Sequence, residues 1–399
     1  EFIKNKSIQI FKKISKKKRI TTNKIEKQLN DKLNNLIKLD PNNLVEIQKI
    51  EEQLNLIRLP EELWKMQLLK IEQNSFDEIP SKYLTNRLKA KQADMSIERL
   101  INSDGNEIEN IDLILEQSRK FYEELYNLED SSKTSRKRFL KNLHKKVSKR
   151  DNRKLLKPFT ISEVKGYLKT TKKNSSPGED GLPYEFFQSF NDVLAPHITQ
   201  AFNLIMMNPN YLPQQWKNGI IKLLYKKGDR RELGNWRPIT LLTTTYKILT
   251  GLIQKRMNLI IPKLIHANQK GFVQNRYILD NVLTVKLIRE INEEGYIVLL
   301  DGEKAFDRVN HNLILDTFKK LKFDYRFILI IKSIIGGSSR IFIRNFFSNE
   351  LQISNGVRQG DTLSPTLFIL VIESLAENIR RDKNCKGLNI SKHHMIKER

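Results

Sequence analysis

The stretch YIVLLDGEKAFDRVN, residues 296–310, joins a short apolar run to a group of acids. The run Tyr296–Leu300 has the length of a buried strand, and it stops at Asp301. An acid at the end of a strand lies at the edge of a sheet, where a hard cation such as Mg²⁺ can reach its oxygens. A turn acid or a helix N-cap explains the same residue equally well. This stretch alone therefore leaves both interpretations of Asp301 open.

Strand-like and helix-like segments alternate on both sides of this stretch. Apolar runs at 219–225 and 340–347 are typical of strands, whereas the longer runs at 241–261, 309–321 and 362–380 are typical of helices. Mixed strands and helices in this order favour an α+β or α/β domain.

The upstream part of the chain is predicted to be mainly helical. Apolar residues recur every three or four positions within 44–73, and a further strong helix is expected at 111–128. Thr160 and Glu163 have the spacing of a capping box, so a helix is expected to begin at Ile161.

Three parts of the chain follow from these patterns. We predict a helical N-terminal extension at 1–132, a basic segment at 133–174 and the mixed domain at 175–399. The single cysteine, Cys385, excludes an internal disulfide and a cysteine-based zinc site. No apolar run is long enough to cross a membrane, and the start of the sequence has no secretory signal.

Positive charge is concentrated in two stretches of the sequence. The net charge is +25 over 399 residues, and residues 1–40 and 133–173 contribute +8 and +14 of it. Such concentration favours contacts with the backbone of a nucleic acid, with a solvated basic surface as the alternative. The proposed contact residues are Arg136, Lys137, Arg138, Lys145, Lys146, Lys149 and Arg150.

Further motifs lie on either side of the opening stretch. The segment 223–242 reads as a hairpin whose Lys226, Lys227 and Arg237 could hold phosphates, because a guanidinium donates two hydrogen bonds at once. A solvated basic loop is the alternative. Gln359 and Gly360 precede a helix expected to begin near Ser364–Pro365, where proline suits the first turn.

The order of the motifs resembles the reverse transcriptases of LINE-type (non-LTR) retrotransposons. The series SPGxDG, K-x-G, NWRPI, QKGF, DxxxAFD and QGxxxSPxLF runs from about Ser175 to Gly387, and FYEELY (121–126) is similar to the segment before the polymerase in those elements. The resemblance implies the fingers and most of the palm of a right-hand polymerase. It implies an RNA template, a DNA primer, target DNA and dNTPs as partners, with the protein in the nucleus and cytoplasm.

The resemblance also implies roles for individual residues. Asp301 and the carbonyl of Gly302 would bind the two Mg²⁺ ions of nucleotidyl transfer. Phe306 would be the aromatic gate that rejects a ribose 2′-OH. The remaining nucleotide contacts would come from Lys226 or Lys227, Arg237, Gln359 and Gly360. Glu303 and Asp307 would be structural, with Asp307 holding the turn into the next helix.

The sequence departs from the family at one point. It contains no Asp-Asp pair, although these enzymes carry an F/Y-x-D-D motif after the Ser364–Pro365 helix. We therefore expect residues 1–399 to be inactive alone. A nucleic-acid-binding fragment without polymerase activity and a group II intron maturase-like reverse transcriptase are the alternatives.

Overall fold

The computed structural model describes residues 20–36, 46–54, 57, 97–102, 105–127, 130–290 and 296–385. The chain divides into two units, residues 1–96 and 97–399. Residues 20–36 and 46–54 of the first unit are helical, and the rest of the predicted 44–73 helix lies outside the described residues, apart from helical residue 57. The helix at 111–126 belongs to the second unit, so the division between the units lies upstream of the predicted boundary at residue 132.

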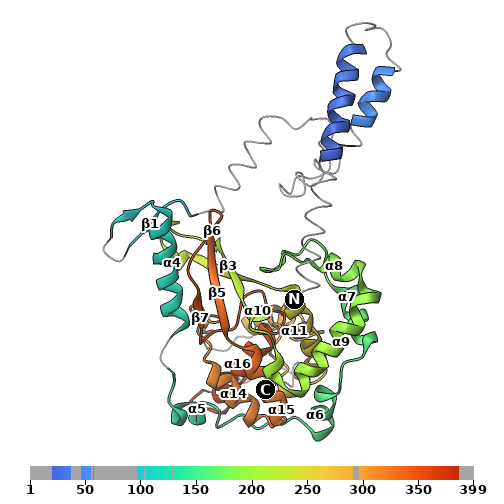
Figure 1. Ribbon diagram of the computed structural model, residues 1–399. Coiled ribbons are helices and arrows are strands. Elements are labelled where there is room, and N and C mark those ends of the chain that lie inside the picture. The colour runs from blue at the N-terminus through green and yellow to red at the C-terminus, as the bar shows by residue number, and fades with distance from the viewer. Residues whose placement is uncertain are drawn as a thin grey trace. The chain divides into compact units, whose positions relative to one another are not determined.

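A five-stranded sheet forms one end of the second unit (Figure 1). Strands β3 (Gly219–Tyr225) and β4 (Trp236–Leu242) form the antiparallel hairpin predicted from the sequence. Strand β5 (Gly337–Ile343) runs parallel to β3. Two short strands, β6 (Phe346–Phe347) and β7 (Leu351–Ile353), pair antiparallel with β5. The sheet thus joins segments that lie more than a hundred positions apart in the sequence.

Helix α4 (Ile111–Tyr126) covers one face of this sheet. Asn110 begins the helix by accepting hydrogen bonds from the amides of Asp112 and Leu113. The buried residues that α4 and the sheet share are Ile114, Leu115, Tyr122, Leu125, Tyr126, Ile221, Leu223, Ile341, Ile343, Leu351 and Ile353. Burying each such side chain contributes about 1.5–3 kcal/mol, so α4 is part of the domain core. A small hairpin of β1 (Leu100–Ile101) and β2 (Glu107–Ile108) precedes it.

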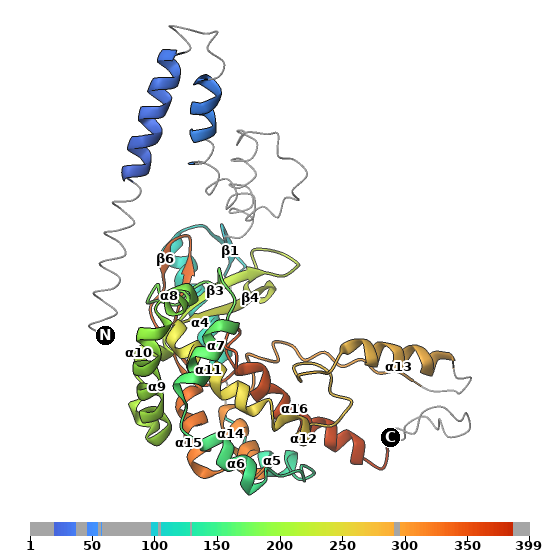
Figure 2. The same ribbon diagram turned by 90° about the vertical axis from the view of Figure 1, so that its right-hand side faces the viewer.

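Other helices follow in the second unit, and all of them except α13 form its body beside the sheet (Figures 1 and 2). They are α5 (Lys133–Phe139), α6 (Lys149–Leu156), α7 (Ile161–Thr170), α8 (Tyr184–Ser189), α9 (Asn191–Met207), α10 (Gln214–Lys217), α11 (Thr244–Met257), α12 (Ile261–Leu264), α13 (Ile278–Glu290), α14 (His311–Lys320), α15 (Tyr325–Ile334) and α16 (Ser364–Arg381). The predicted capping box at the start of α7 is confirmed. Helix α16 begins at the predicted Ser364.

One predicted strand is divided in two, and another is wrong. Residues 340–347 form β5 and β6 with a tight turn between them, because Arg344 and Asn345 both have positive φ, of 48° and 72°. Residues 296–300 have no regular secondary structure, and Tyr296 is 98% exposed. No described segment pairs with 296–300, and an apolar run forms a stable strand only beside another strand.

Helix α13 contributes no buried side chain to the part of the core that the structure describes. It extends away from the body of the unit (Figure 2), and none of its residues is buried. In α16, Leu367, Leu370 and Val371 are buried, whereas Leu375 is 40% exposed. No helix in the described ranges has the length and apolar character needed to span a membrane.

Candidate active site

The loop 355–361, which contains the predicted Gln359 and Gly360, joins β4 to the turn that follows Asp301. The amide of Gly356 donates to the carbonyl of Val309 (2.7 Å), and the amide of Val357 donates to the carbonyl of Phe306 (2.8 Å). The amide of Thr240 in β4 donates to the carbonyl of Gln359 (2.7 Å). Three separate segments of the chain are therefore fixed against one another at this loop.

Close approach to β4 explains the glycine at position 360. Gly360 has a φ of +123°, and a Cβ there would lie 2.4 Å from the carbonyl oxygen of Thr240. The buried guanidinium of Arg358 donates to the carbonyls of Lys217 and Gly336, so the loop is also attached to these two segments of the chain. Gly360 is a predicted nucleotide contact, and the group that lies closest to it here is the protein's own backbone.

Asp307 lies at the centre of the site, although its predicted role was only to hold a turn. The side chain of Gln359 donates through Nε2 to Asp307 Oδ2 (2.9 Å), and the hydroxyl of Tyr126 donates to Oδ1 (3.4 Å). The cap of the next helix is instead Asn310, whose side chain accepts from the amide of Leu313. Asp307 therefore joins the loop to helix α4 rather than capping α14.

Burial controls the ionisation of this carboxyl group. It raises the pKa of Asp307 to about 6, and the hydrogen bonds from Gln359 and Tyr126 oppose the rise. Burial, together with the nearby Asp307 charge, also raises the pKa of Tyr126 well above its usual value. Tyr126 closes the FYEELY segment, but no residue in that segment had been assigned a role in the site.

Phe306, the predicted gate, is held between two other aromatic rings. It stacks on Phe368 of α16, with ring centroids 4.5 Å apart and an angle of 18° between the planes. The edge of Phe272, in the QKGF motif, contacts it at a centroid distance of 5.9 Å. The structure thus brings three of the sequence motifs together around this ring.

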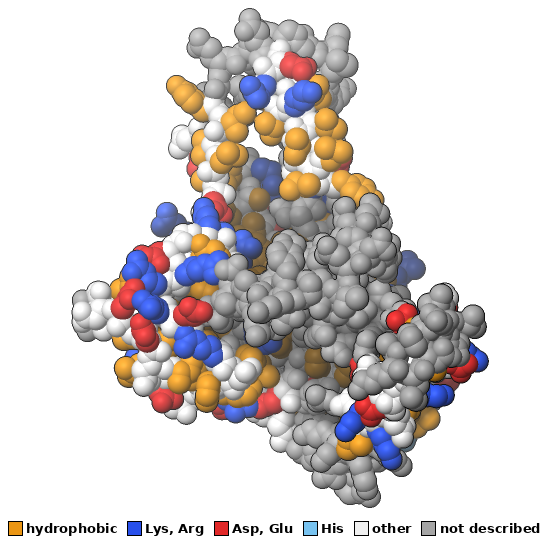
Figure 3. All heavy atoms as spheres, turned by 90° about the horizontal axis from the view of Figure 1, so that it is seen from above, with side chains coloured by type: hydrophobic (Ala, Val, Ile, Leu, Met, Phe, Trp, Pro, Cys, Tyr) orange, Lys and Arg blue, Asp and Glu red, His pale blue; other side chains and the backbone are white. Residues whose placement is uncertain are grey.

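The cations of the β3–β4 hairpin fall into two groups, those that contact other side chains of the protein and those that are exposed without an ion-pair partner among the described residues. Arg231 is held by Asp229 and Glu107, each at 2.7 Å, and Arg230 lies over the ring of Tyr225. The predicted triphosphate contacts Lys226, Lys227 and Arg237 are exposed and have no ion-pair partner among the described residues. The side of the molecule with β1 and α4, on the left in Figures 1 and 3, shows cationic side chains intermixed with acidic ones.

The SPGEDG motif forms a turn that packs against the end of β4. A Cβ on Gly178 would lie 2.4 Å from the backbone of Leu242 and Thr243, so only glycine fits there. The ammonium group of Lys247 donates to the carbonyl of Ser176 at 3.0 Å. The motif is therefore built for close packing against the hairpin.

Asp301, the predicted metal ligand, is exposed on an irregular segment. Nearby, Glu303 is also exposed and lies 3.5 Å from Arg308. In the part of the chain that the structure describes, no group of three or more His, Cys, Asp or Glu side chains is placed to hold a metal ion. The described residues therefore do not fit a complete two-metal site, since two dications about 4 Å apart need several carboxylate ligands.

The basic segment passes along helices α14 and α15, to which it is anchored. The amide of Val147 donates to the carbonyl of Leu321 (2.8 Å), and the side chain of Asn152 donates to the carbonyl of Lys322 (2.9 Å). Six of the seven cations predicted to bind nucleic acid keep partly or fully exposed side chains: Lys137, Arg138, Lys145, Lys146, Lys149 and Arg150.

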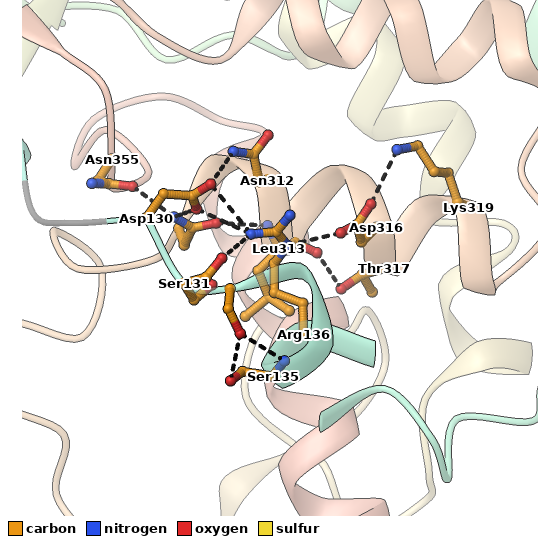
Figure 4. A network of polar contacts seen from close by, with 12 residues as sticks. Asp130, Ser131, Ser135, Arg136, Asn312, Leu313, Asp316, Thr317, Lys319 and Asn355 are labelled. Carbon is orange, nitrogen blue, oxygen red and sulfur yellow. Dashed lines mark hydrogen bonds and ion pairs between the residues drawn. The ribbon is translucent and has the colours of Figure 1, made fainter. Parts of the chain in front are cut away.

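Arg136 is the exception, and we correct its predicted role. Its side chain is 11% exposed and donates to Asp316 (2.8 Å) and Asp130 (3.2 Å), as Figure 4 shows. Asn310 and Asn312 also donate to Asp130, at 2.7 and 2.8 Å, and these bonds, with Arg136, lower the pKa of Asp130. The guanidinium is therefore occupied in joining α5 to α14.

Comparisons with known proteins agree with the motif order. Residues 224–394 match the family described as reverse transcriptase (RNA-dependent DNA polymerase). Similar proteins include the transposon TX1 uncharacterized 149 kDa protein of Xenopus laevis, 34% identical over 283 residues, and the RNA-directed DNA polymerase from mobile element jockey of Drosophila melanogaster, 29% identical over 221. The Pol polyprotein of retrotransposable element R2 from Popillia japonica is 28% identical over 228 residues.

These alignments cover much of this chain but little of the relatives. They include 69%, 53% and 55% of this chain for TX1, jockey and R2, against 21%, 24% and 30% of the three relatives. The chain thus spans less than a third of the length of each of them. The family match and these relatives show that the chain contains a reverse transcriptase domain of the kind found in LINE-type (non-LTR) retrotransposons.

Proposed function

We propose that this chain supplies the fingers and part of the palm of an RNA-directed DNA polymerase. In the reaction, the 3′-hydroxyl of a DNA primer on an RNA template attacks the α-phosphate of a dNTP, and pyrophosphate leaves. The observation that carries the proposal is the loop 355–361, which is bonded both to β4 of the finger hairpin and to the turn Phe306–Val309. Catalysis of this kind depends mostly on positioning and charge neutralisation, and such a junction suits it.

The residues around this junction would contact different parts of the nucleotide. Arg237 and one of Lys226 and Lys227 are exposed cations on the hairpin that would neutralise the triphosphate. Phe306 would pack under the sugar, and Gln359 and Gly360 would contact the nucleotide and the template strand.

Mg²⁺ is the proposed metal, with Asp301 and the carbonyl of Gly302 among its ligands. An exposed carboxylate is a suitable ligand for a hard cation, but the described residues supply no group of three or more candidate ligands around it. We therefore propose that residues 1–399 bind Mg²⁺ weakly and do not extend a primer by themselves.

The six exposed cations of the basic segment would bind the phosphate backbone of RNA or of an RNA–DNA duplex. They lie on a segment held rigidly against the body of the unit, so binding would order few residues. We propose that the whole protein works with its RNA in the cytoplasm and nucleus, where target DNA is found.

Primer extension tests the proposed activity. The substrates are poly(rA)–oligo(dT), Mg²⁺ and dTTP, and the proteins are residues 1–399 and an extended chain that includes roughly the next two hundred residues encoded by its gene, a thumb-sized span. We expect extension by the extended chain alone. Activity of the shorter chain would contradict the proposed incomplete metal site.

The alternative is a nucleic-acid-binding protein without polymerase activity. The lack of a metal-binding cluster among the described residues favours it. Two observations together would establish it instead. The gene would encode no Asp-Asp pair, and the extended chain would bind poly(rA)–oligo(dT) without extending the primer.

A further inference from the structure

Three side chains from distant segments meet at one buried carboxylate. Tyr126 comes from the end of α4, Asp307 from the turn before α14, and Gln359 from the loop 355–361. The Gln359 bond to Asp307 is 2.9 Å, and the Tyr126 bond is 3.4 Å. Because Asp307 is only 2% exposed, water cannot replace either donor.

The backbone around this contact limits the movement of Gln359. The loop is bonded to the turn through Gly356 and Val357, and to β4 through the Gln359 carbonyl. These bonds place the main chain of Gln359, and the side-chain bond from Gln359 to Asp307 adds a further link between the loop and the turn. The carboxylate of Asp307 is the acceptor that selects one orientation of the carboxamide.

Helix α4 is well placed to hold the other oxygen of Asp307. Its own position is set by buried contacts with the sheet, including the hydroxyl of Tyr122, which donates to the carbonyl of Trp236 at 3.2 Å. The Tyr126 hydroxyl therefore reaches Asp307 from an element that does not depend on the loop.

We propose that Asp307, oriented by Tyr126, is a positioning residue that holds the Gln359 side chain for the incoming nucleotide. Helix α4 then contributes to the nucleotide site through Tyr126. This inference rests on the proposed polymerase function. It assigns a role in the reaction to a helix upstream of the residues 224–394 that match the reverse transcriptase family.

The first test measures amide hydrogen exchange in residues 1–399 and does not need activity. We expect Asp307→Asn to increase exchange at Gly356 and Val357 by about tenfold, and Tyr126→Phe by about threefold. Tyr122→Phe is the matched control, because it removes another buried hydroxyl of α4 that bonds outside the loop; it should leave these two amides unchanged.

A double variant tests the hydrogen bond between Asp307 and Gln359 directly. Asp307→Asn combined with Gln359→Glu reverses donor and acceptor and keeps one charged partner. We expect this pair to reverse the increase in exchange that Asp307→Asn alone causes. Equal effects of Tyr126→Phe and Tyr122→Phe, or no effect of Asp307→Asn, would overturn the inference.

Steady-state kinetics of the extended chain provide the second readout. Loss of positioning should raise the KM for dTTP about tenfold in Asp307→Asn and about threefold in Tyr126→Phe, with a smaller change in kcat. A purely structural role would reduce the active fraction and leave KM unchanged. If the unaltered chain does not extend the primer, the proposed function fails, and the exchange experiment still decides whether Asp307 positions the loop.

Discussion

The ring of Phe306 stacks on the ring of Phe368, with centroids 4.5 Å apart. This stacking ties the DxxxAFD motif to the first turns of α16, which follow the QG motif. An aromatic ring supported on one face by a second ring has little freedom to move aside. Phe306 can therefore act as a fixed steric limit, as a sugar gate requires.

Replacing Phe306 should relax the choice of sugar. In the extended chain we expect Phe306→Val to accept ribonucleotides, because the space under the 2′-hydroxyl opens. The measurement compares rNTP with dNTP incorporation on one primer–template. If Phe306 were only a core residue, truncation to Ala would cost about 3–5 kcal/mol of stability without any change in that ratio. Phe318→Val, within the core of α14, is the control for weakened packing.

Replacing the guanidinium of Arg237 should weaken nucleotide binding. Arg237→Lys keeps the charge but loses the planar pair of donors that matches a phosphate. We expect a higher KM for dNTP in the extended chain and nearly unchanged affinity for the template. Arg326→Lys, at an exposed arginine of α15, is the matched control and should change neither value. An unchanged KM would leave Arg237 without a role in nucleotide binding.

The stability of the domain should carry a pH-dependent contribution from Asp307. Its pKa is about 6 in the folded protein because of burial, above the usual value of 3.8. Between pH 3.8 and about pH 6 the folded state binds more protons than the unfolded state, so the contribution of Asp307 to the unfolding free energy falls as the pH rises. The loss should reach about 3 kcal/mol by pH 7.

Comparison with Asp307→Asn isolates this contribution. Other carboxyl groups, such as Asp130 and Asp151, have lowered pKa values and change stability in the opposite direction. The difference in unfolding free energy, variant minus unaltered protein, should therefore rise from pH 4 to pH 7 in urea titrations. A difference that stays flat over this range would contradict a buried, ionising Asp307.

Binding of RNA should depend steeply on salt through the basic segment. Changing Lys145, Lys146, Lys149 and Arg150 to Gln should weaken binding to all sequences alike, and should reduce the salt slope by about 0.7 to 0.9 for each phosphate that is no longer neutralised. Arg136→Gln should behave differently, because it breaks the ion pairs with Asp130 and Asp316 and so lowers stability. Affinity that is indifferent to salt would exclude binding through the phosphate backbone.

Elements with local signals were predictable from the sequence. The capping box at Thr160 fixes the start of α7, and Pro365 marks the first turn of α16. The hairpin of β3 and β4 needs only its own alternation and a polar link. In each case the interactions that form the element lie within a few residues of one another.

Elements that depend on distant partners were not predictable in this way. The run at 296–300 has the composition of a strand, but pairing, and not composition, decides whether it forms one. Tyr126 and Asp307 lie 181 positions apart, and no local pattern marks either as the partner of the other. Arg136 resembles the other cations around it, and only the placement of Asp130 and Asp316 shows that its charge is occupied.

The parallel pairing of β3 with β5 also constrains how the protein is made. Asn218 and Ser338, which share a hydrogen bond at the start of these strands, are 120 positions apart. A ribosome that adds about 5–20 residues per second needs about 6–24 s to synthesise the intervening chain. For the later part of that time, once β4 is complete at Leu242, the β3–β4 hairpin and α4 lack the central strand that completes their core. We expect the nascent hairpin to be a binding site for chaperones, and slow synthesis across 243–336 to favour aggregation over folding.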